Sequence, residues 1–121
     1  MPVETHGLSH LSLAVRDLER AARFYAVFGC REHARDGRSV QLLGPGGRDV
    51  IALELRPEHA GAAGGVRHFG FRLVRAGDLD AAVSEAVAAG GSLVRRGAFA
   101  PGCPYAYVTD PDGYTVEIWF E

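Results

Sequence analysis

One pattern of elements occurs twice along the chain, and this repeat restricts the fold more than any other feature. The stretch "SHLSLAVRDLERAARFYAVFGC" in the first half matches "RHFGFRLVRAGDLDAAVSEAVAAGG" in the second, in pattern rather than in identity. Each stretch opens with a histidine and a strand-like run, passes through Asp-Leu into a helix-like run, and ends at glycine. Such internal similarity predicts two copies of one structural unit.

Periodicity and turn residues predict the same order of elements in both halves. The first half reads as a strand over 8–15, a helix over 18–28 capped by Asp17, and strands over 30–35, 39–44 and 49–55. The second reads as a strand over 68–74, a helix over 79–89 capped by Asp78, and strands over 92–97, 105–109 and 114–120. We therefore predict one α+β domain over 1–121, built from two βαβββ modules (8–55 and 67–120) and a flexible connector (56–66).

Composition narrows the classes of function. With 47% hydrophobic residues, a chain of 121 residues suits a single domain with its own core. The net charge is −2 and the basic residues are scattered, which argues against nucleic acid or an anionic membrane as partner. All thirteen basic residues are arginine, so Schiff-base lysine chemistry and lysine-dependent phosphate loops are excluded. A small-molecule partner is expected.

The cysteines and the N-terminal segment predict the cellular location of the protein. Cys30 and Cys103 lie far apart without a CxxC pair, and "MPVETHGL" lacks the regions of a signal peptide. We expect reduced thiols in a soluble, cytoplasmic protein.

Strand alternation places four metal-ligand side chains on one kind of face. In "LSHLSLAV", Leu11, Leu13 and Val15 share the apolar face, and His10 points the other way. The same parity places Glu54, His68 and Glu117 opposite the apolar residues of their strands.

If a pseudo-twofold relates the two halves, His10, Glu54, His68 and Glu117 converge on one site. Two imidazoles and two carboxylates suit zinc, nickel, cobalt, manganese or iron(II). A bound cation would also offset the cost of burying Glu117 within "TVEIWF". The other histidines (His6, His33 and His59) are expected to be exposed.

Further residues are candidates for substrate contact. Parity places Ser12, Gln41, Arg72, Tyr107 and Trp119 on the same faces as the four ligand candidates. Phe99 lies in "RRGAFAPGCPY", which we expect to form an irregular loop over the site because of Gly97, Pro101 and Gly102.

Over nearly its whole length the sequence resembles the vicinal oxygen chelate superfamily, which groups glyoxalases, bleomycin resistance proteins and extradiol dioxygenases. The resemblance rests on "HLSLAVRDLERAARFYAVFG", "IALEL", "RHFGFRL" and above all "YVTDPDGYTVEIWF". It implies a cupped mixed sheet around a divalent metal, with ligands at the positions of His10, Glu54, His68 and Glu117. It also implies that the metal is chelated by two adjacent oxygens of a substrate.

Similarity to glyoxalases implies a lyase or isomerase in which Glu117 or Glu54 moves a proton. However, Ala14 and Glu58 stand where that branch has glutathione-binding arginine and asparagine, so a glutathione adduct is not the expected substrate. Similarity to fosfomycin resistance proteins is limited to Ser12, because that branch also needs a lysine.

Three alternatives remain open. His10, His68 and Glu117 would supply the iron(II) ligands of an extradiol dioxygenase, with Tyr105 and Tyr107 as acid–base candidates. Epimerases rank lower because they usually carry glutamine at the second ligand position. Binding-only antibiotic resistance proteins have generally lost the ligands that this chain keeps. The resemblance further implies a homodimer, either with the halves exchanged between chains or without exchange.

Overall fold

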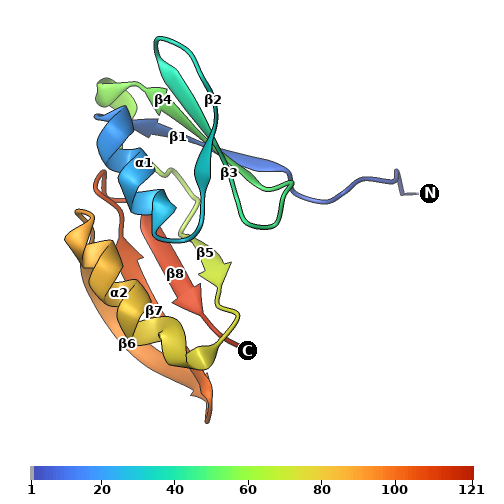
Figure 1. Ribbon diagram of the computed structural model, residues 1–121, viewed down its shortest axis with the longest axis vertical. Helices are drawn as coiled ribbons and strands as arrows, with labels where there is room; N and C mark the ends of the chain where they lie inside the picture. The colour runs from blue at the N-terminus through green and yellow to red at the C-terminus, as the bar shows by residue number, and fades with distance from the viewer. Residues whose placement is uncertain (1) are drawn as a thin grey trace.

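The computed structural model describes residues 2–121 and shows the two halves of the chain as two units (Figure 1). The first unit, in the upper part of Figure 1, contains β1 (His10–Val15), α1 (Leu18–Ala26), β2 (Arg31–Arg35), β3 (Ser39–Leu43) and β4 (Val50–Leu55). The second unit contains β5 (Phe69–Arg72), α2 (Leu79–Ala88), β6 (Ser92–Ala100), β7 (Cys103–Thr109) and β8 (Thr115–Trp119). Two short 3-10 helices, η1 (Pro57–His59) and η2 (Ala76–Asp78), complete the set. The predicted βαβββ order is therefore present in each half.

Each half forms its own four-stranded mixed sheet with the same strand order. The orders are β1-β4-β3-β2 and β5-β8-β7-β6. The first and last strands of each half pair in parallel, and the other pairs are antiparallel. This confirms the predicted α+β class with mixed sheets.

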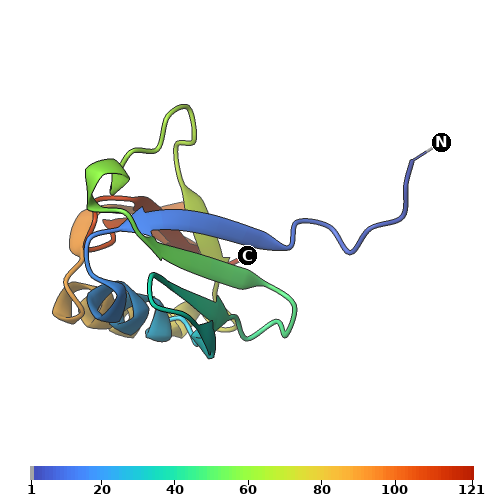
Figure 2. The same ribbon diagram turned by 90° about the horizontal axis from the view of Figure 1, so that it is seen from above.

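One face of each sheet is covered and the other is open. In β1, Leu13 and Val15 are buried, whereas His10 and Ser12 are exposed. The helices lie together on one side of the molecule (Figure 2), and their residues join the sheet residues in a single apolar cluster. The predicted parity is confirmed, so the chemically useful side chains lie on the faces opposite the helices, here called the open faces.

The two helices begin differently. The Asp17 side chain accepts a hydrogen bond from the Arg20 backbone N–H at 3.0 Å, as predicted for a cap of α1. This bond, together with the nearby Arg20 charge, lowers the pKa of Asp17. Asp78 makes no such bond within the described residues, because η2 already turns the chain into α2, and its carboxylate pairs with Arg75 at 3.2 Å. Asp78 is therefore the N-cap residue of α2, as predicted, but in residues 2–121 it caps the helix without a side-chain hydrogen bond.

β6 is longer than the sequence indicates, which corrects the expectation for Phe99. The strand continues through Gly97 and Phe99 to Ala100. Its register with β7 shifts at two bulges, one between Leu93 and Arg95 and one between Ala98 and Ala100. Phe99 therefore lies on an edge strand of the second sheet rather than on a loop. Only the turn at Pro101 and Gly102 separates β6 from β7.

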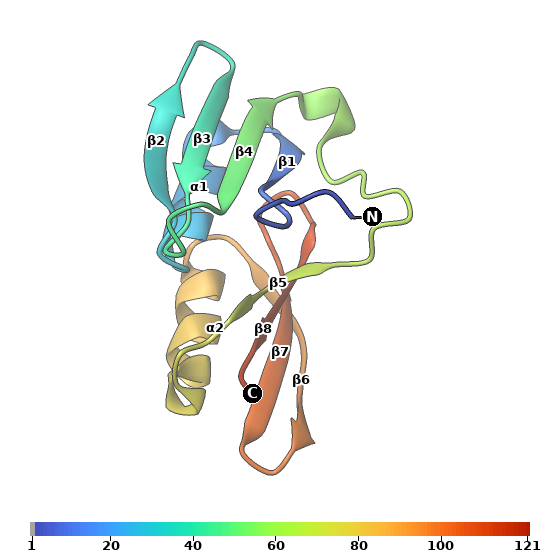
Figure 3. The same cartoon turned by 90° about the vertical axis from the view of Figure 1, so that its right-hand side faces the viewer.

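The connector is also more ordered than expected. Pro57–His59 forms η1, and the segment after it runs down one side of the molecule from the first sheet to the second (Figure 3). In residues 2–121, no helix is long and apolar enough to cross a membrane. His6, His33 and His59 are exposed, as expected, and both cysteines are free thiols.

Aromatic stacking joins the two halves on the helix side. The rings of Phe28 and Phe71 stack at 4.4 Å between centroids, with 2° between their planes. Tyr25 lies against Phe69 and Phe71, with centroid distances of 6.2 and 6.4 Å. α1 thus packs against β5 as well as against its own sheet.

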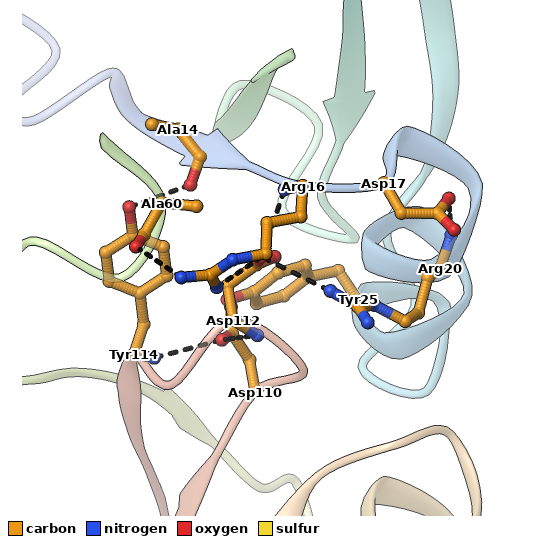
Figure 4. Close-up of polar contacts among 9 residues, drawn as sticks. All are labelled: Ala14, Arg16, Asp17, Arg20, Tyr25, Ala60, Asp110, Asp112 and Tyr114. Atoms are coloured by element: carbon orange, nitrogen blue, oxygen red, sulfur yellow. Dashed lines mark hydrogen bonds and ion pairs between the residues drawn. The ribbon is translucent and has the colours of Figure 1, made fainter. Parts of the chain in front are cut away.

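A polar contact set, here called the clasp, joins the halves at one end (Figure 4). It consists of Arg16, Arg20 and Tyr25 from the first half and Asp110, Asp112 and Tyr114 from the second. The Tyr25 hydroxyl donates to Asp110 Oδ2 at 2.5 Å, and the Tyr114 hydroxyl donates to the Ala14 carbonyl at 2.8 Å. Asp112 Oδ1 accepts from the Arg16 backbone N–H at 3.0 Å and from both guanidinium groups at 3.3 Å. The DPDG turn therefore holds the two halves together.

Candidate functional site

Two of the four predicted ligands meet on the open face of the second sheet. His68 Nε2 lies 3.5 Å from Glu117 Oε1, and the side chains are 39% and 13% exposed. His68 lies directly before β5, and Glu117 is the central residue of β8, which pairs with β5. The pairing of these two strands brings the imidazole and the carboxylate together.

The surroundings of Glu117 are shaped by its neighbours on both sides. Gly70 is its partner on β5, and a Cβ at Gly70 would lie 2.8 Å from the Glu117 carbonyl oxygen and 3.2 Å from the Glu117 Cβ. Glycine therefore lets β5 approach the backbone of β8 closely at Glu117. On the other side, Tyr107 of β7 is the register partner of Glu117, and its ring meets His68 edge to face at 5.1 Å. Desolvation and the nearby Glu117 carboxylate raise the pKa of Tyr107.

The other two ligand candidates lie on the open face of the first sheet. His10 is exposed and its Nδ1 is 2.7 Å from the Ser9 hydroxyl. Its register partner on β4 is Val50, whereas Glu54 is opposite Ala14 at the far end of the same pair of strands. Glu54 Oε2 lies 3.9 Å from Arg56. Among residues 2–121, no group of three or more potential ligands gathers within a single chain.

The pair of His68 and Glu117 has the donor chemistry and spacing of half a metal site. Nitrogen and oxygen donors each about 2.1 Å from a tetrahedral zinc ion lie about 3.4 Å apart, and the observed separation is 3.5 Å. The same pair also suits nickel, cobalt, manganese and iron(II). Two donors do not complete such a site, so further ligands are needed.

A cavity of about 410 Å³ separates the two halves next to this pair. Apolar side chains of β1, β5 and the connector form part of its walls. Its polar and charged lining consists of Ser12, Glu54, Arg56, His59, Arg67 and His68. Ser12, Glu54 and His68 are thus brought to one hollow, while His10 and Glu117 lie outside its lining. Connector residues, among them Ala62, Ala63 and Val66, form part of its wall.

Four of the six predicted substrate contacts gather on the open face of the second sheet. The Arg72 guanidinium lies 5.2 Å from the centroid of Trp119, and Phe99 meets Trp119 edge to face at 6.4 Å. Tyr107 of β7 pairs in register with Glu117, two residues before Trp119 on β8. Ser12 lines the cavity instead, and Gln41 is exposed on the other sheet, where it pairs in register with Ala52.

Sequence reasoning missed two residues of this face. Tyr105 contacts Phe99 and Tyr107, with centroid distances of 4.6 and 5.6 Å, and Arg95 lies 4.9 Å from the centroid of Tyr107. Tyr105 was considered only as an acid–base candidate. Alternation along β6 could not have identified Arg95, because the bulge between Leu93 and Arg95 breaks the alternation and places Arg95 opposite Tyr107.

Comparison with known proteins agrees with this architecture. The family model of the Glyoxalase/Bleomycin resistance protein/Dioxygenase superfamily matches residues 7–118. No curated protein matches the sequence.

Solved structures share the fold over almost the whole chain. A glyoxalase-related enzyme from Fulvimarina pelagi is 28% identical, with a TM-score of 0.76 over 97% of this chain and 89% of that one. A lactoylglutathione lyase from Agrobacterium tumefaciens is 22% identical, with a TM-score of 0.70 over 96% and 94%. A genomically encoded fosfomycin resistance protein from Listeria monocytogenes is 20% identical, with a TM-score of 0.80 over 98% and 95%. The last two similarities establish the fold alone.

Proposed function

We propose that this chain, which belongs to the Glyoxalase/Bleomycin resistance protein/Dioxygenase superfamily, is a metal-dependent, glyoxalase-like lyase or isomerase. Its substrate would be a small molecule that presents two adjacent oxygens. The observation that carries this proposal is the close pair of His68 and Glu117, with an imidazole nitrogen and a carboxylate oxygen 3.5 Å apart on an open sheet face. A bound divalent ion would stabilise negative charge that develops on the substrate oxygens.

The missing ligands point to a homodimer. His10 and Glu54 are on the open face of the first sheet, and the described residues of one chain do not gather three ligands. We therefore propose that the first sheet of one chain completes the site around His68 and Glu117 of a second copy, through Glu54 or His10, which lie four residues apart in the register of β1 and β4. Two such sites then form in a symmetric dimer.

Within this site, Glu117 is the residue proposed to move the proton. Its side chain is 13% exposed, against 46% for Glu54, so Glu117 is the better shielded of the two carboxylates. A shielded carboxylate beside the reacting carbon acts as a general base more effectively than a hydrated one, because less water must be displaced. Glu54 is proposed as a ligand and as the second candidate for proton transfer.

The first experiment measures metal content in protein purified without added metal or chelator. We expect about one divalent ion per chain, and loss of that ion when His68 and Glu117 are both changed to alanine. His33→Ala is the matched control, because His33 is exposed on β2 and lies outside the cavity beside the ligand pair. Iron would direct assays to dioxygenase activity, and zinc, nickel, cobalt or manganese to lyase or isomerase activity. Absence of metal after reconstitution would reject the proposal and leave a binding protein.

The second experiment tests whether the site is shared between chains. One variant carries His10→Ala and Glu54→Ala, and the other carries His68→Ala and Glu117→Ala. Neither should bind metal alone. After unfolding and refolding together, random pairing should restore about one quarter of the sites, because each mixed dimer contains one intact set of ligands. No recovery in a mixture shown to contain mixed dimers would exclude exchange of halves.

The proposed proton transfer is tested with Glu117→Gln once a substrate is found. Loss of a general base lowers kcat about 10²- to 10⁴-fold. A variant that retains metal and full activity would exclude this role for Glu117.

A further inference from the structure

The open face of the second sheet carries more aromatic surface than a metal site requires. Four aromatic side chains from β6, β7 and β8 contact one another in sequence, and we call them the ring row. In the order of their contacts they are Trp119, Phe99, Tyr105 and Tyr107. Successive contacts join Trp119 to Phe99, Phe99 to Tyr105 and Tyr105 to Tyr107, with centroids 4.6–6.4 Å apart. The row ends at His68, which Tyr107 meets at 5.1 Å.

The rings are partly open to contact. Phe99 is 59% exposed, and Tyr105, Tyr107 and Trp119 are partly buried. Gly97 makes the arrangement possible, since a Cβ there would lie 2.5 Å from the Tyr105 hydroxyl oxygen. Tyr105 can therefore lie across β6 toward Phe99.

Two arginines flank the row from opposite sides. The guanidinium carbon of Arg72 on β5 lies 5.2 Å from the centroid of Trp119, and that of Arg95 on β6 lies 4.9 Å from the centroid of Tyr107. Within residues 2–121, neither arginine forms an ion pair. A guanidinium close to a ring and without a carboxylate partner has N–H groups that can bind an oxyanion. The face thus combines flat apolar surface with unneutralised positive charge.

The register fixes the distance from the ligand pair. Trp119 is two residues beyond Glu117 on β8, so the side chains lie about 6.6 Å apart along the strand. A substrate with its reacting oxygens beside Glu117 would extend over Trp119 and Arg72 with its remaining part.

We infer that this face recognises a planar aromatic or conjugated anion, with its ring on Phe99 and Trp119 and its anionic group on Arg72. The position of the reacting oxygens in this inference rests on the proposed function, but the recognition of ring and charge does not require the metal. Arg72 and Trp119 are then specificity-determining residues rather than catalytic ones. A small aliphatic substrate would leave the ring row without a partner.

The test uses calorimetry on the wild-type protein in the presence of a chelator, with three probes of similar size. Trans-cinnamate has a planar conjugated ring and a carboxylate, cinnamamide has the same ring without charge, and 3-cyclohexylpropanoate has the charge without a planar ring. We expect cinnamate to bind at least fivefold more tightly than either of the other two. Quenching of Trp119, the sole tryptophan of the chain, provides an independent reading.

Variants then show which residue gives the preference for a charged probe and which gives the preference for a planar ring. Arg72→Gln should abolish the preference for cinnamate over cinnamamide, whereas Arg75→Gln, at an exposed arginine outside the ring row, should leave it unchanged. Trp119→Leu should abolish the preference over 3-cyclohexylpropanoate. Equal binding of all probes, absence of binding, or equal effects of the two arginine variants would overturn the inference.

The same titrations with metal-reconstituted protein separate this inference from the proposed function. Probe selectivity in a protein that takes up no metal would support the inference and reject the proposed function. Metal uptake without probe selectivity would support the proposed function and overturn the inference.

Discussion

Glu117 occupies surroundings unlike those of the carboxylates on the molecular surface. Its side chain is 13% exposed, whereas those of Glu19 and Glu58 are 62% and 61% exposed. Its shielding comes from β5 and β7 on either side, and Gly70 sets how closely β5 approaches. The position of one carboxylate therefore depends on a residue that has no side chain.

At the scale of single residues, we predict that Gly70→Ala disturbs the site. The new Cβ would lie 2.8 Å from a backbone oxygen, which forces β5 and β8 apart. Overpacking of this kind costs about 1–3 kcal/mol, to be measured by urea unfolding. Gly77→Ala is the control, because nothing lies within 4 Å of a Cβ at that position. Equal stability of the two variants would contradict the prediction.

At the scale of elements, the sequence predicted the presence and covered faces of the strands better than it predicted where the strands end or which site residues meet. Alternation identified the core faces correctly, because residues such as Leu13 and Val15 report burial directly. Gly97 and Pro101 indicated a loop, but bulges let β6 continue to Ala100. Parity placed four ligands on open faces, yet only their positions in three dimensions show that His68 and Glu117 meet and that His10 lies elsewhere.

The clasp was missed because its members are far apart in sequence. Asp110 and Asp112 indicated a turn, and Tyr25 indicated a packed helix residue. Neither pattern states that the turn binds the helix of the other half, since residues 25 and 110 become neighbours only when the halves pack together.

The two helix starts also yield a prediction at this scale. Asp17→Ala removes the hydrogen bond to the Arg20 N–H, and loss of such a cap should lower the Tm by about 2–5 °C. Asp78→Ala should change the Tm by less, because Asp78 makes no cap bond within the described chain. Calorimetry compares the variants directly, and an equal loss at both positions would contradict this account of the caps.

For the whole molecule, attachment between the halves depends on stacked rings and on the clasp. Burial, followed by the charge of Asp110, raises the pKa of Tyr25. Burial likewise raises the pKa of Asp110, although hydrogen bonds from Tyr25 and from two backbone N–H groups partly offset this. The neutral phenol is thus the form that the folded protein stabilises.

We predict that the contribution of Tyr25 to the free energy of unfolding falls in alkali. The unfolded chain releases the Tyr25 proton above about pH 10, while the folded protein keeps it. The stabilisation is therefore complete below that pH and is lost as the pH rises, by up to about 1.4 kcal/mol per pH unit. Tyr25→Phe should reduce this slope and cost about 1–3 kcal/mol at pH 7, since Asp110 loses a donor.

Urea unfolding between pH 7 and 11 measures both effects. Tyr105→Phe is the control, because Tyr105 lies on the ring row and not in the clasp. A wild-type slope that Tyr25→Phe leaves unchanged would contradict the prediction.

The strand order has a consequence for how the chain can be divided. Because β1 pairs with β4 and β5 pairs with β8, each sheet is built from strands of one half, and in residues 2–121 no strand of one half joins the sheet of the other. A break in the connector would leave two fragments that each hold a complete sheet, whereas a break inside either half would separate strands that pair. The connector is thus the natural place at which the gene can be split, duplicated or recombined, and reassembly of the fragments would depend on the apolar cluster, the stacked rings and the clasp.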